Sequence, residues 1–110
     1  MVPTRKIGIV TVARSDYGIY RPILRAIEKD PGLELQLFVG GTHLARGFGQ
    51  TVNEITEDGF VPAALIHSIL DAEEPNAISK SLGLQITGFA DALTQHRPDI
   101  LLVLGDRFEM

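Results

Sequence analysis

Three short segments of the sequence carry the side chains best suited to chemistry. One holds Arg14 and Asp16, one holds Thr42 and His43, and one holds Asp106, Arg107 and Glu109. Carboxylates and histidines transfer protons when their pKa values suit the operating pH, and a guanidinium binds an oxyanion through paired hydrogen bonds. These residue types indicate proton transfer and the binding of an anionic group as the candidate chemistry.

The first two segments also have plain structural interpretations. Arg14 is either a surface cation or a ligand for a phosphate or sugar. Asp16 stands between a predicted strand and a predicted helix, so it is more typical of a helix cap than of a catalyst. His43 is either an ordinary loop histidine or a site residue, because histidine titrates near neutral pH and serves in both roles. The residues alone leave these alternatives open.

The third segment contains the strongest catalytic candidate. Asp106 follows an apolar run and a glycine, which favours a position at the ligand-binding edge of a sheet over a cap or a turn. Arg107 and Glu109 can pair with each other, and an exposed pair of that kind contributes little to stability. We therefore take Asp106 as the candidate catalytic residue.

Alternating strands and helices must position these segments. Short apolar runs rich in β-branched residues predict buried strands over residues 7–12 and 100–104. An alternating pattern predicts a strand over residues 33–39. A further strand over residues 60–67 is expected to pair only in its later part, because Pro62 has no backbone N–H to donate.

Helical spacing of apolar residues predicts three helices between these strands. Pro22 is tolerable only in a first turn, so the first helix is expected to begin late, and residues 30–32 end it. Thr51 and Glu54 fit a capping box that opens a short helix ending at Gly59. The third helix ends at Arg97 and is predicted to carry one apolar stripe, made of Ile78, Leu82, Ile86, Phe89, Ala90 and Leu93.

This alternation predicts a three-layer, Rossmann-like α/β domain with a parallel sheet over residues 1–110. Loops that follow parallel strands emerge at one edge of the sheet, so the three segments are expected along that edge. The last predicted strand lacks the helix that the alternation calls for. We therefore expect the domain to be incomplete and the sequence to belong to a longer chain.

Composition excludes several classes of function. A net charge of −4 with scattered basic residues disfavours nucleic-acid binding. Without cysteine there is no thiolate metal site, and three histidines form no persuasive metal constellation. No glycine-rich dinucleotide motif follows the first strand, and the apolar run near the N-terminus is shorter than the roughly 20 residues of a membrane span. We expect a cytoplasmic protein with no metal, no cofactor, and no nucleic-acid or membrane partner.

Three motifs follow one another along nearly the whole chain. They are Ala13-Arg14-Ser15-Asp16-Tyr17-Gly18 with Arg21-Pro22, then Gly41-Thr42-His43-Leu44 with Phe48-Gly49-Gln50-Thr51 and Glu54-Ile55, then Pro98-Asp99 with Leu104-Gly105-Asp106-Arg107-Phe108-Glu109. In this order and spacing the chain resembles the hydrolysing UDP-N-acetylglucosamine 2-epimerases of the sialic-acid pathway type. Each motif alone is weak, but the three together are specific.

The resemblance implies the N-terminal half of a two-domain, glycosyltransferase-B-like fold with the second domain absent. It also implies conversion of UDP-GlcNAc to UDP and N-acetylmannosamine by elimination and rehydration, without a cofactor, in a homodimer of the full-length chain. In that reaction Asp106 would do acid/base work or position the sugar, and Arg14 would stabilise the departing UDP. His43 would shape the sugar site, and Arg107 and Glu109 would bind substrate or orient Asp106. The 110 residues alone are expected to be inactive.

Three alternatives stay open at this point. A relative of the same fold could act on a UDP-diacetamido sugar or on GDP-GlcNAc, and the residues present do not separate these substrates. A glycosyltransferase half-domain shares the fold but fits Gly105-Asp106-Arg107 less well. A non-catalytic α/β binding module is the third alternative, because fold alone does not decide function.

Overall fold

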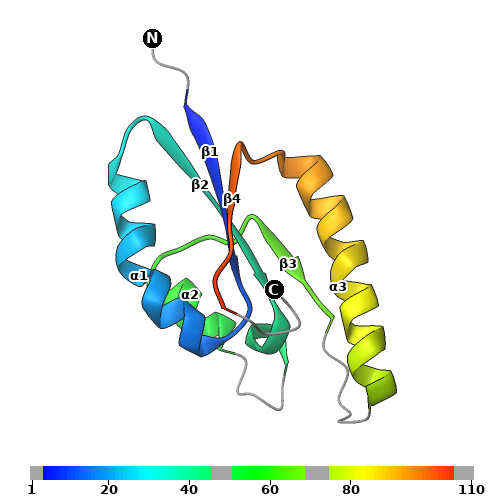
Figure 1. The fold of residues 1–110 in the computed structure, drawn as a ribbon. Helices are drawn as coiled ribbons and strands as arrows, with labels where there is room; N and C mark the ends of the chain where they lie inside the picture. The colour runs from blue at the N-terminus through cyan, green and yellow to red at the C-terminus, as the bar shows by residue number, and fades with distance from the viewer. Residues whose placement is uncertain (1–3, 46–50, 69–74, 106–110) are drawn as a thin grey trace.

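Four parallel strands form the centre of the molecule (Figure 1). The computed structural model describes residues 4–45, 51–68 and 75–105. The strands are β1 (Arg5–Thr11), β2 (Leu33–Gly40), β3 (Ala64–Ile66) and β4 (Ile100–Leu102), and they lie side by side in the order β3-β2-β1-β4. Each neighbouring pair runs parallel. The predicted α/β fold with a parallel sheet is confirmed.

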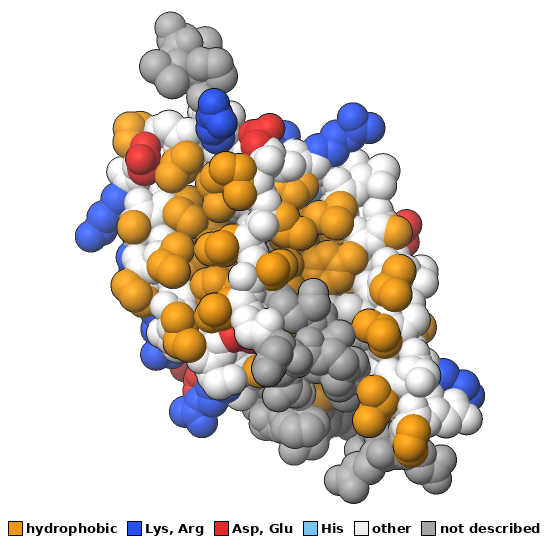
Figure 2. All heavy atoms as spheres, in the orientation of Figure 1, with side chains coloured by type: hydrophobic (Ala, Val, Ile, Leu, Met, Phe, Trp, Pro, Cys, Tyr) orange, Lys and Arg blue, Asp and Glu red, His pale blue; other side chains and the backbone are white. Residues whose placement is uncertain are grey.

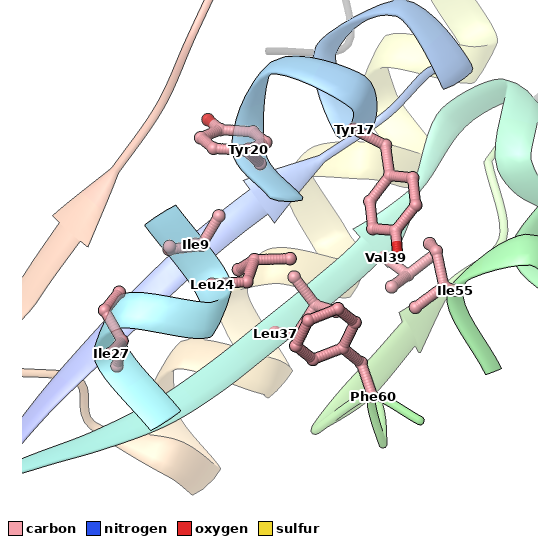
Figure 3. Close-up of a cluster of buried hydrophobic side chains, with 9 residues drawn as sticks. All are labelled: Ile9, Tyr17, Tyr20, Leu24, Ile27, Leu37, Val39, Ile55 and Phe60. Atoms are coloured by element: carbon pink, nitrogen blue, oxygen red, sulfur yellow. The ribbon is translucent and has the colours of Figure 1, made fainter. Parts of the chain in front are cut away.

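Helices cover both faces of this sheet. On one face, α1 (Arg14–Lys29) and α2 (Val52–Glu57) enclose a core of nine buried side chains (Figure 3). That core consists of Ile9, Tyr17, Tyr20, Leu24, Ile27, Leu37, Val39, Ile55 and Phe60. On the other face, α3 (Pro75–His96) packs over a smaller cluster that includes Val10, Phe38 and Ile66. The arrangement is the predicted three-layer, Rossmann-like one.

The late start predicted for the first helix is wrong. The helix begins at Arg14, and Pro22 lies in its interior. A proline there leaves the carbonyl of the residue four positions earlier without its helical donor, and that residue is Gly18. Both Pro22 and Gly18 are exposed, so water can bind the carbonyl. The burial of Tyr17 and Leu24 on the opposite face supports the helix across this defect.

The apolar stripe predicted for the third helix is also wrong at most of its positions. Ile78, Leu82, Ile86 and Ala90 are exposed, and the buried positions are Ala77, Ser81, Gln85 and Ala92. Close approach of helix and sheet explains this choice, because a Cβ at Gly88 would lie 2.6 Å from Ile66 Cγ2. Three of the four buried side chains are therefore small, and Gln85 is the exception. Phe89 and Leu93, from the predicted stripe, do pack against the core, although only partly buried.

Two strand predictions have different outcomes. Pairing of β3 is confined to Ala64–Ile66, as Pro62 requires. The predicted buried strand over residues 100–104 is shorter, Ile100–Leu102, and it is exposed. Within the described residues β4 pairs only with β1. Its side chains therefore have a neighbouring strand at one edge and none at the other.

Candidate functional site

The carboxyl ends of β1 and β2 meet at one edge of the sheet (Figure 1). The loop after β1 leads into α1 and carries Arg14, and the short 3₁₀ helix η1 (Gly41–Leu44) follows β2 and carries His43. Topology thus brings two of the three predicted segments to the same edge. The third segment, with Asp106, Arg107 and Glu109, lies outside the described residues.

Gly41 allows the loops after β1 and β2 to approach closely enough to form hydrogen bonds. The Thr42 backbone N–H and side-chain hydroxyl both donate to the Val12 carbonyl, at 2.8 and 3.0 Å. Gly41 has a φ of 57°, and a Cβ there would lie 2.5 Å from the same carbonyl oxygen. Glycine alone among the residues tolerates both the left-handed backbone and this close contact. The position of His43 relative to β1 depends on it.

A buried row of hydrogen bonds crosses this edge from α1 to the residue before α2. Asp16 Oδ1 accepts from the Thr11 hydroxyl. Thr11 Oγ1 also lies 2.8 Å from His43 Nε2, and His43 Nδ1 lies 2.8 Å from Thr51 Oγ1. Thr11, Asp16 and His43 are buried. Four side chains from four separate segments therefore form one connected polar unit.

Asp16 also caps the first helix, as its residue type predicts. Its second oxygen, Oδ2, accepts the backbone N–H groups of Val12 and Ala13 at 3.1 and 3.0 Å. Ala13 is the N-cap, so Asp16 occupies the third helical position and fulfils the acidic half of a capping box. A carboxylate at a helix N-terminus is further favoured by the helix dipole.

The capping box predicted for the second helix does not form. Thr51 is the N-cap of α2, but its side chain makes no capping hydrogen bond and instead contacts His43. Glu54 turns to Arg14, with 3.1 Å between Arg14 Nε and Glu54 Oε1. Neither side chain makes the capping hydrogen bond that its spacing predicts, and both contact residues from other segments of the sheet edge. Such departures from local preference are typical of functional sites.

His43 lies inside the protein, with no exposed surface. Burial lowers the pKa of its imidazole, and the nearby charges of Asp16 and Glu54 only partly oppose this. Both ring nitrogens have a hydroxyl partner, and the Tyr17 ring packs edge-on at 6.1 Å between centroids. The geometry suits a neutral imidazole that holds its surroundings in place.

Arg14 occupies the opposite environment. Its side chain is 74% exposed, and Glu54 is its ion-pair partner. An exposed pair of this kind is weak, so the guanidinium is available to an anionic ligand. In the resemblance Arg14 is the residue that meets the nucleotide, and its exposure at the start of α1 is compatible with that role.

A second polar group joins α1 to the end of α2. Asp58 Oδ2 accepts from the Tyr17 hydroxyl at 2.5 Å and from Arg21 Nε at 2.9 Å. Burial and then the hydrogen bond to Asp58 raise the pKa of Tyr17 to about 12, and the bond from Tyr17 lowers the pKa of Asp58. Tyr17 packs in the core and also anchors the end of α2 through Asp58. Sequence reasoning missed Asp58 and Thr11, because nothing in their local patterns distinguishes them from ordinary turn and strand residues, and it assigned Thr51 to a capping box.

Beside η1 the described residues line only a small cavity. A cavity of about 40 Å³ beside η1 is lined by Gly41, Leu44, Ala45, His67 and Ser68. Ligand pockets for molecules of drug size have volumes of about 300–1,000 Å³, so this cavity is too small for a nucleotide sugar. Among the residues that the structure describes, no three His, Asp or Glu side chains gather as a metal site would need. None of the described helices combines the length and apolar character of a membrane span.

Solved structures share this fold. The chain superposes with a TM-score of 0.74 on the UDP-GlcNAc 2-epimerase from Neisseria meningitidis bound to UDP-GlcNAc, over 94% of this chain and 27% of that one, at 16% identity. A second UDP-N-acetylglucosamine 2-epimerase structure gives 0.76 over 96% of this chain and 28% of that one, at 17% identity. At these identities the likeness establishes the Rossmann-like fold alone.

Sequence comparison is more specific. The family model for UDP-N-acetylglucosamine 2-epimerase matches residues 25–110, which is more than half of the chain. The chain therefore belongs to the UDP-N-acetylglucosamine 2-epimerase family.

Curated relatives match over 96% of this chain. They include the hydrolysing UDP-N,N'-diacetylbacillosamine 2-epimerase of Legionella pneumophila at 37% identity and the hydrolysing GDP/UDP-N,N'-diacetylbacillosamine 2-epimerase of Campylobacter jejuni at 35%. The UDP-N-acetylglucosamine 2-epimerase of Neisseria meningitidis is 32% identical. The chain spans only 28% of the first relative and 27% of the other two.

Proposed function

We propose that the full-length protein is a hydrolysing nucleotide-sugar 2-epimerase that converts UDP-GlcNAc to UDP and N-acetylmannosamine. The observation that carries the hydrolysing reaction is the alignment of 96% of the chain with two relatives, 37% and 35% identical, that are named as hydrolysing 2-epimerases. The family model that matches residues 25–110 supports UDP-GlcNAc as the substrate. The three motifs of the sequence support the same assignment. The resemblance is also the basis for proposing a cytoplasmic homodimer with a second domain.

The proposed reaction has two steps. A base removes the proton at C2 while the bond from C1 to the UDP oxygen breaks, so that UDP leaves with the bonding electrons and a C1–C2 double bond forms in 2-acetamidoglucal. Water then adds its hydroxyl to C1. A proton enters C2 from the face opposite to the one from which the first proton was removed, so the configuration at C2 is inverted. Proton transfers of this kind require a positioned acid and base, and the departing diphosphate requires a fixed cation.

Residue roles follow the motifs. Arg14 is proposed to stabilise the departing diphosphate, and its exposure at the sheet edge supports this, because a ligand can reach it. Asp106 is proposed as the acid/base or sugar-positioning residue, with Arg107 and Glu109 binding substrate or orienting it. His43 is proposed to shape the sugar site, and its full burial favours support of that site over direct proton transfer.

A UDP-diacetamido sugar is the second candidate substrate. The two relatives with the higher identities, 37% and 35%, act by name on diacetylbacillosamine nucleotides, against 32% for the UDP-N-acetylglucosamine enzyme. The difference in identity is small, so both substrates belong in the first assay. GDP-linked sugars belong in the same panel.

The test is an incubation of the full-length protein with each nucleotide sugar in heavy water, followed by proton NMR. Free nucleoside diphosphate together with a C2-deuterated, epimerised sugar is the expected result. Arg14→Ala should reduce turnover strongly, whereas Lys29→Ala, an exposed cation at the other end of α1, should not. Absence of product from every sugar would overturn the proposal and favour a non-catalytic binding module.

A further inference from the structure

The hydrogen bonds at the sheet edge have a fixed direction. An ionised carboxylate is an acceptor only, so the Thr11 hydroxyl must donate its single hydrogen to Asp16 Oδ1. Toward His43 the oxygen of Thr11 can then only accept. The 2.8 Å contact between Thr11 Oγ1 and His43 Nε2 therefore requires a hydrogen on Nε2.

The rest of the row follows from the chemistry of imidazole. A neutral imidazole carries one N–H, and the buried surroundings of His43 favour the neutral ring. With the hydrogen on Nε2, Nδ1 is an acceptor. The Thr51 hydroxyl, 2.8 Å away, must donate to it. The direction of every bond from Thr51 back to Asp16 is thus set at the carboxylate.

We infer that Asp16 is a positioning residue, which through Thr11 fixes His43 as the Nε2–H tautomer and orients Thr51 at the start of α2. Capping of the first helix uses only Oδ2 of Asp16, so the bond from Oδ1 to Thr11 serves a separate purpose. That purpose is to join the end of β1, the start of α1, η1 and the start of α2 as one unit.

The unit of Thr11, Asp16, His43 and Thr51 also influences the position of the candidate ligand residue Arg14. Arg14 lies two residues before Asp16, and its partner Glu54 lies three residues after Thr51. Their 3.1 Å contact therefore depends on how α1 and α2 are held relative to each other. The functional part of this inference rests on the proposed function, in which Arg14 meets the nucleotide.

The tautomer is measured directly. We would label the full-length protein with ¹⁵N-histidine and assign both ring nitrogens of His43 by NMR, with the exposed His67 as an internal reference. The expected result is a protonated-type shift at Nε2 and an unprotonated-type shift at Nδ1. The opposite pattern, or a charged ring near neutral pH, would overturn the inference.

Asp16→Asn tests the control by the carboxylate. The amide oxygen can keep both backbone N–H groups of Val12 and Ala13, while the amide NH₂ now donates to Thr11 and reverses the row. His43 should change to the Nδ1–H tautomer, and kcat for the proposed hydrolysis should fall on the order of 10-fold to 100-fold because the site is misaligned. Asp91→Asn, an exposed carboxylate on α3, is the matched control and should change neither value.

Each outcome has a distinct meaning. A folded Asp16→Asn protein that keeps the Nε2–H tautomer, or that changes tautomer at full activity, would overturn the inference. If no nucleotide sugar reacts with the unsubstituted protein, the proposed function fails, and the tautomer measurements still decide the hydrogen-bond assignment. If Asp16→Asn does not fold, Thr11→Val and Thr11→Ser replace it, because both leave the Oδ2 cap intact. Equal activity of these two variants would contradict a positioning role.

Discussion

His43 and Arg14 lie at the same edge of the sheet but in opposite surroundings. His43 is enclosed and bonded at both ring nitrogens, whereas Arg14 is mostly in solvent with one weak ion pair. A buried neutral ring resists protonation, while an exposed guanidinium exchanges partners readily. A change of pH should therefore reveal the contribution of His43, and the addition of an anionic ligand should reveal that of Arg14.

Stability should decline with acid partly because of His43. Burial lowers the pKa of the folded-state ring below the ordinary histidine value of about 6.5, so the unfolded chain binds the proton more tightly. This contribution to the unfolding free energy is fully present above pH 6.5 and is lost as the pH falls through the lower pKa of the folded state. His43→Gln keeps one donor and one acceptor but does not titrate. Denaturant unfolding between pH 7 and 5 should show a shallower decline for this variant than for the unsubstituted protein, and parallel curves would refute the prediction.

Glu54 should compete with an anionic ligand for Arg14. The Glu54→Gln substitution removes the charge that pairs with Arg14 at 3.1 Å, and an exposed ion pair is worth up to about 1 kcal/mol. UDP binding to the full-length protein should therefore tighten by no more than about 5-fold. Calorimetric titration measures this, with Glu57→Gln as an exposed control on the same helix. Weaker binding by Glu54→Gln would indicate that Glu54 supports the ligand instead.

At the scale of the elements, Gly41 is the position where the loop after β2 depends on one residue type. Gly41→Ala should destabilise the fold by about 1–3 kcal/mol from the left-handed backbone alone, and the contact at 2.5 Å from the Val12 carbonyl adds to this. Gly83→Ala is the matched change, since Gly83 is exposed in the interior of α3 with open space around it. It should be stabilising by about 0.5–1 kcal/mol. Thermal unfolding of both variants measures the difference. An unchanged melting temperature for Gly41→Ala would contradict the close contact between Gly41 and the Val12 carbonyl.

Patterns along the chain were sufficient to predict the order of strands and helices along the sequence and the sheet edge at which Arg14 and His43 both lie. They failed where tertiary contacts outweigh local preference. Pro22 predicts a helix boundary, but the burial of one face of α1 carries the helix through it. Ile78 and Leu82 suggest a buried stripe, but close packing at Gly88 requires small residues on the sheet side.

The location of the candidate site at the sheet edge could be predicted from the sequence, but the hydrogen bonds and the ion pair within it could not. The type of Asp16 predicts a cap, and it is one, yet the bond of its other oxygen to Thr11 has no local signature. Thr51 and Glu54 match a capping box by spacing, and the structure uses both for contacts to η1 and α1 instead. The contacts of Thr11 with His43, 32 positions away, and of Arg14 with Glu54 cannot be read from the pattern around either residue.

At the scale of the whole molecule, a broad apolar surface extends over β4 and the neighbouring helices (Figure 2). The side chains of β4 and of the residue after it are between 37% and 51% exposed, and they are Ile100, Leu101, Leu102 and Val103. Patches of this kind on a free surface mark sites of association. Among the described strands β4 pairs on one side only, so its outer edge adds backbone donors and acceptors.

The 110 residues expressed alone should therefore self-associate. They should also not hydrolyse any nucleotide sugar, because they span only 27–28% of the length of the relatives. Light scattering after size-exclusion chromatography measures the first property, and the heavy-water NMR assay measures the second. Leu102→Lys with Ile100→Lys should reduce association, whereas Lys substitution at Thr87, an exposed polar site on α3, should not. A monodisperse monomer with turnover would contradict both expectations.

The row from Asp16 to Thr51 has an evolutionary consequence. Because each hydroxyl and ring nitrogen has its role assigned by its neighbour, a single replacement leaves the next member facing the wrong kind of partner. Matched replacements could keep the sequence of donors and acceptors intact. Positions 11, 16, 43 and 51 should therefore covary among relatives, and the cost of a double substitution should differ from the sum of the two single ones. The four residues would then be inherited as one unit, although they are scattered over 41 positions of the chain.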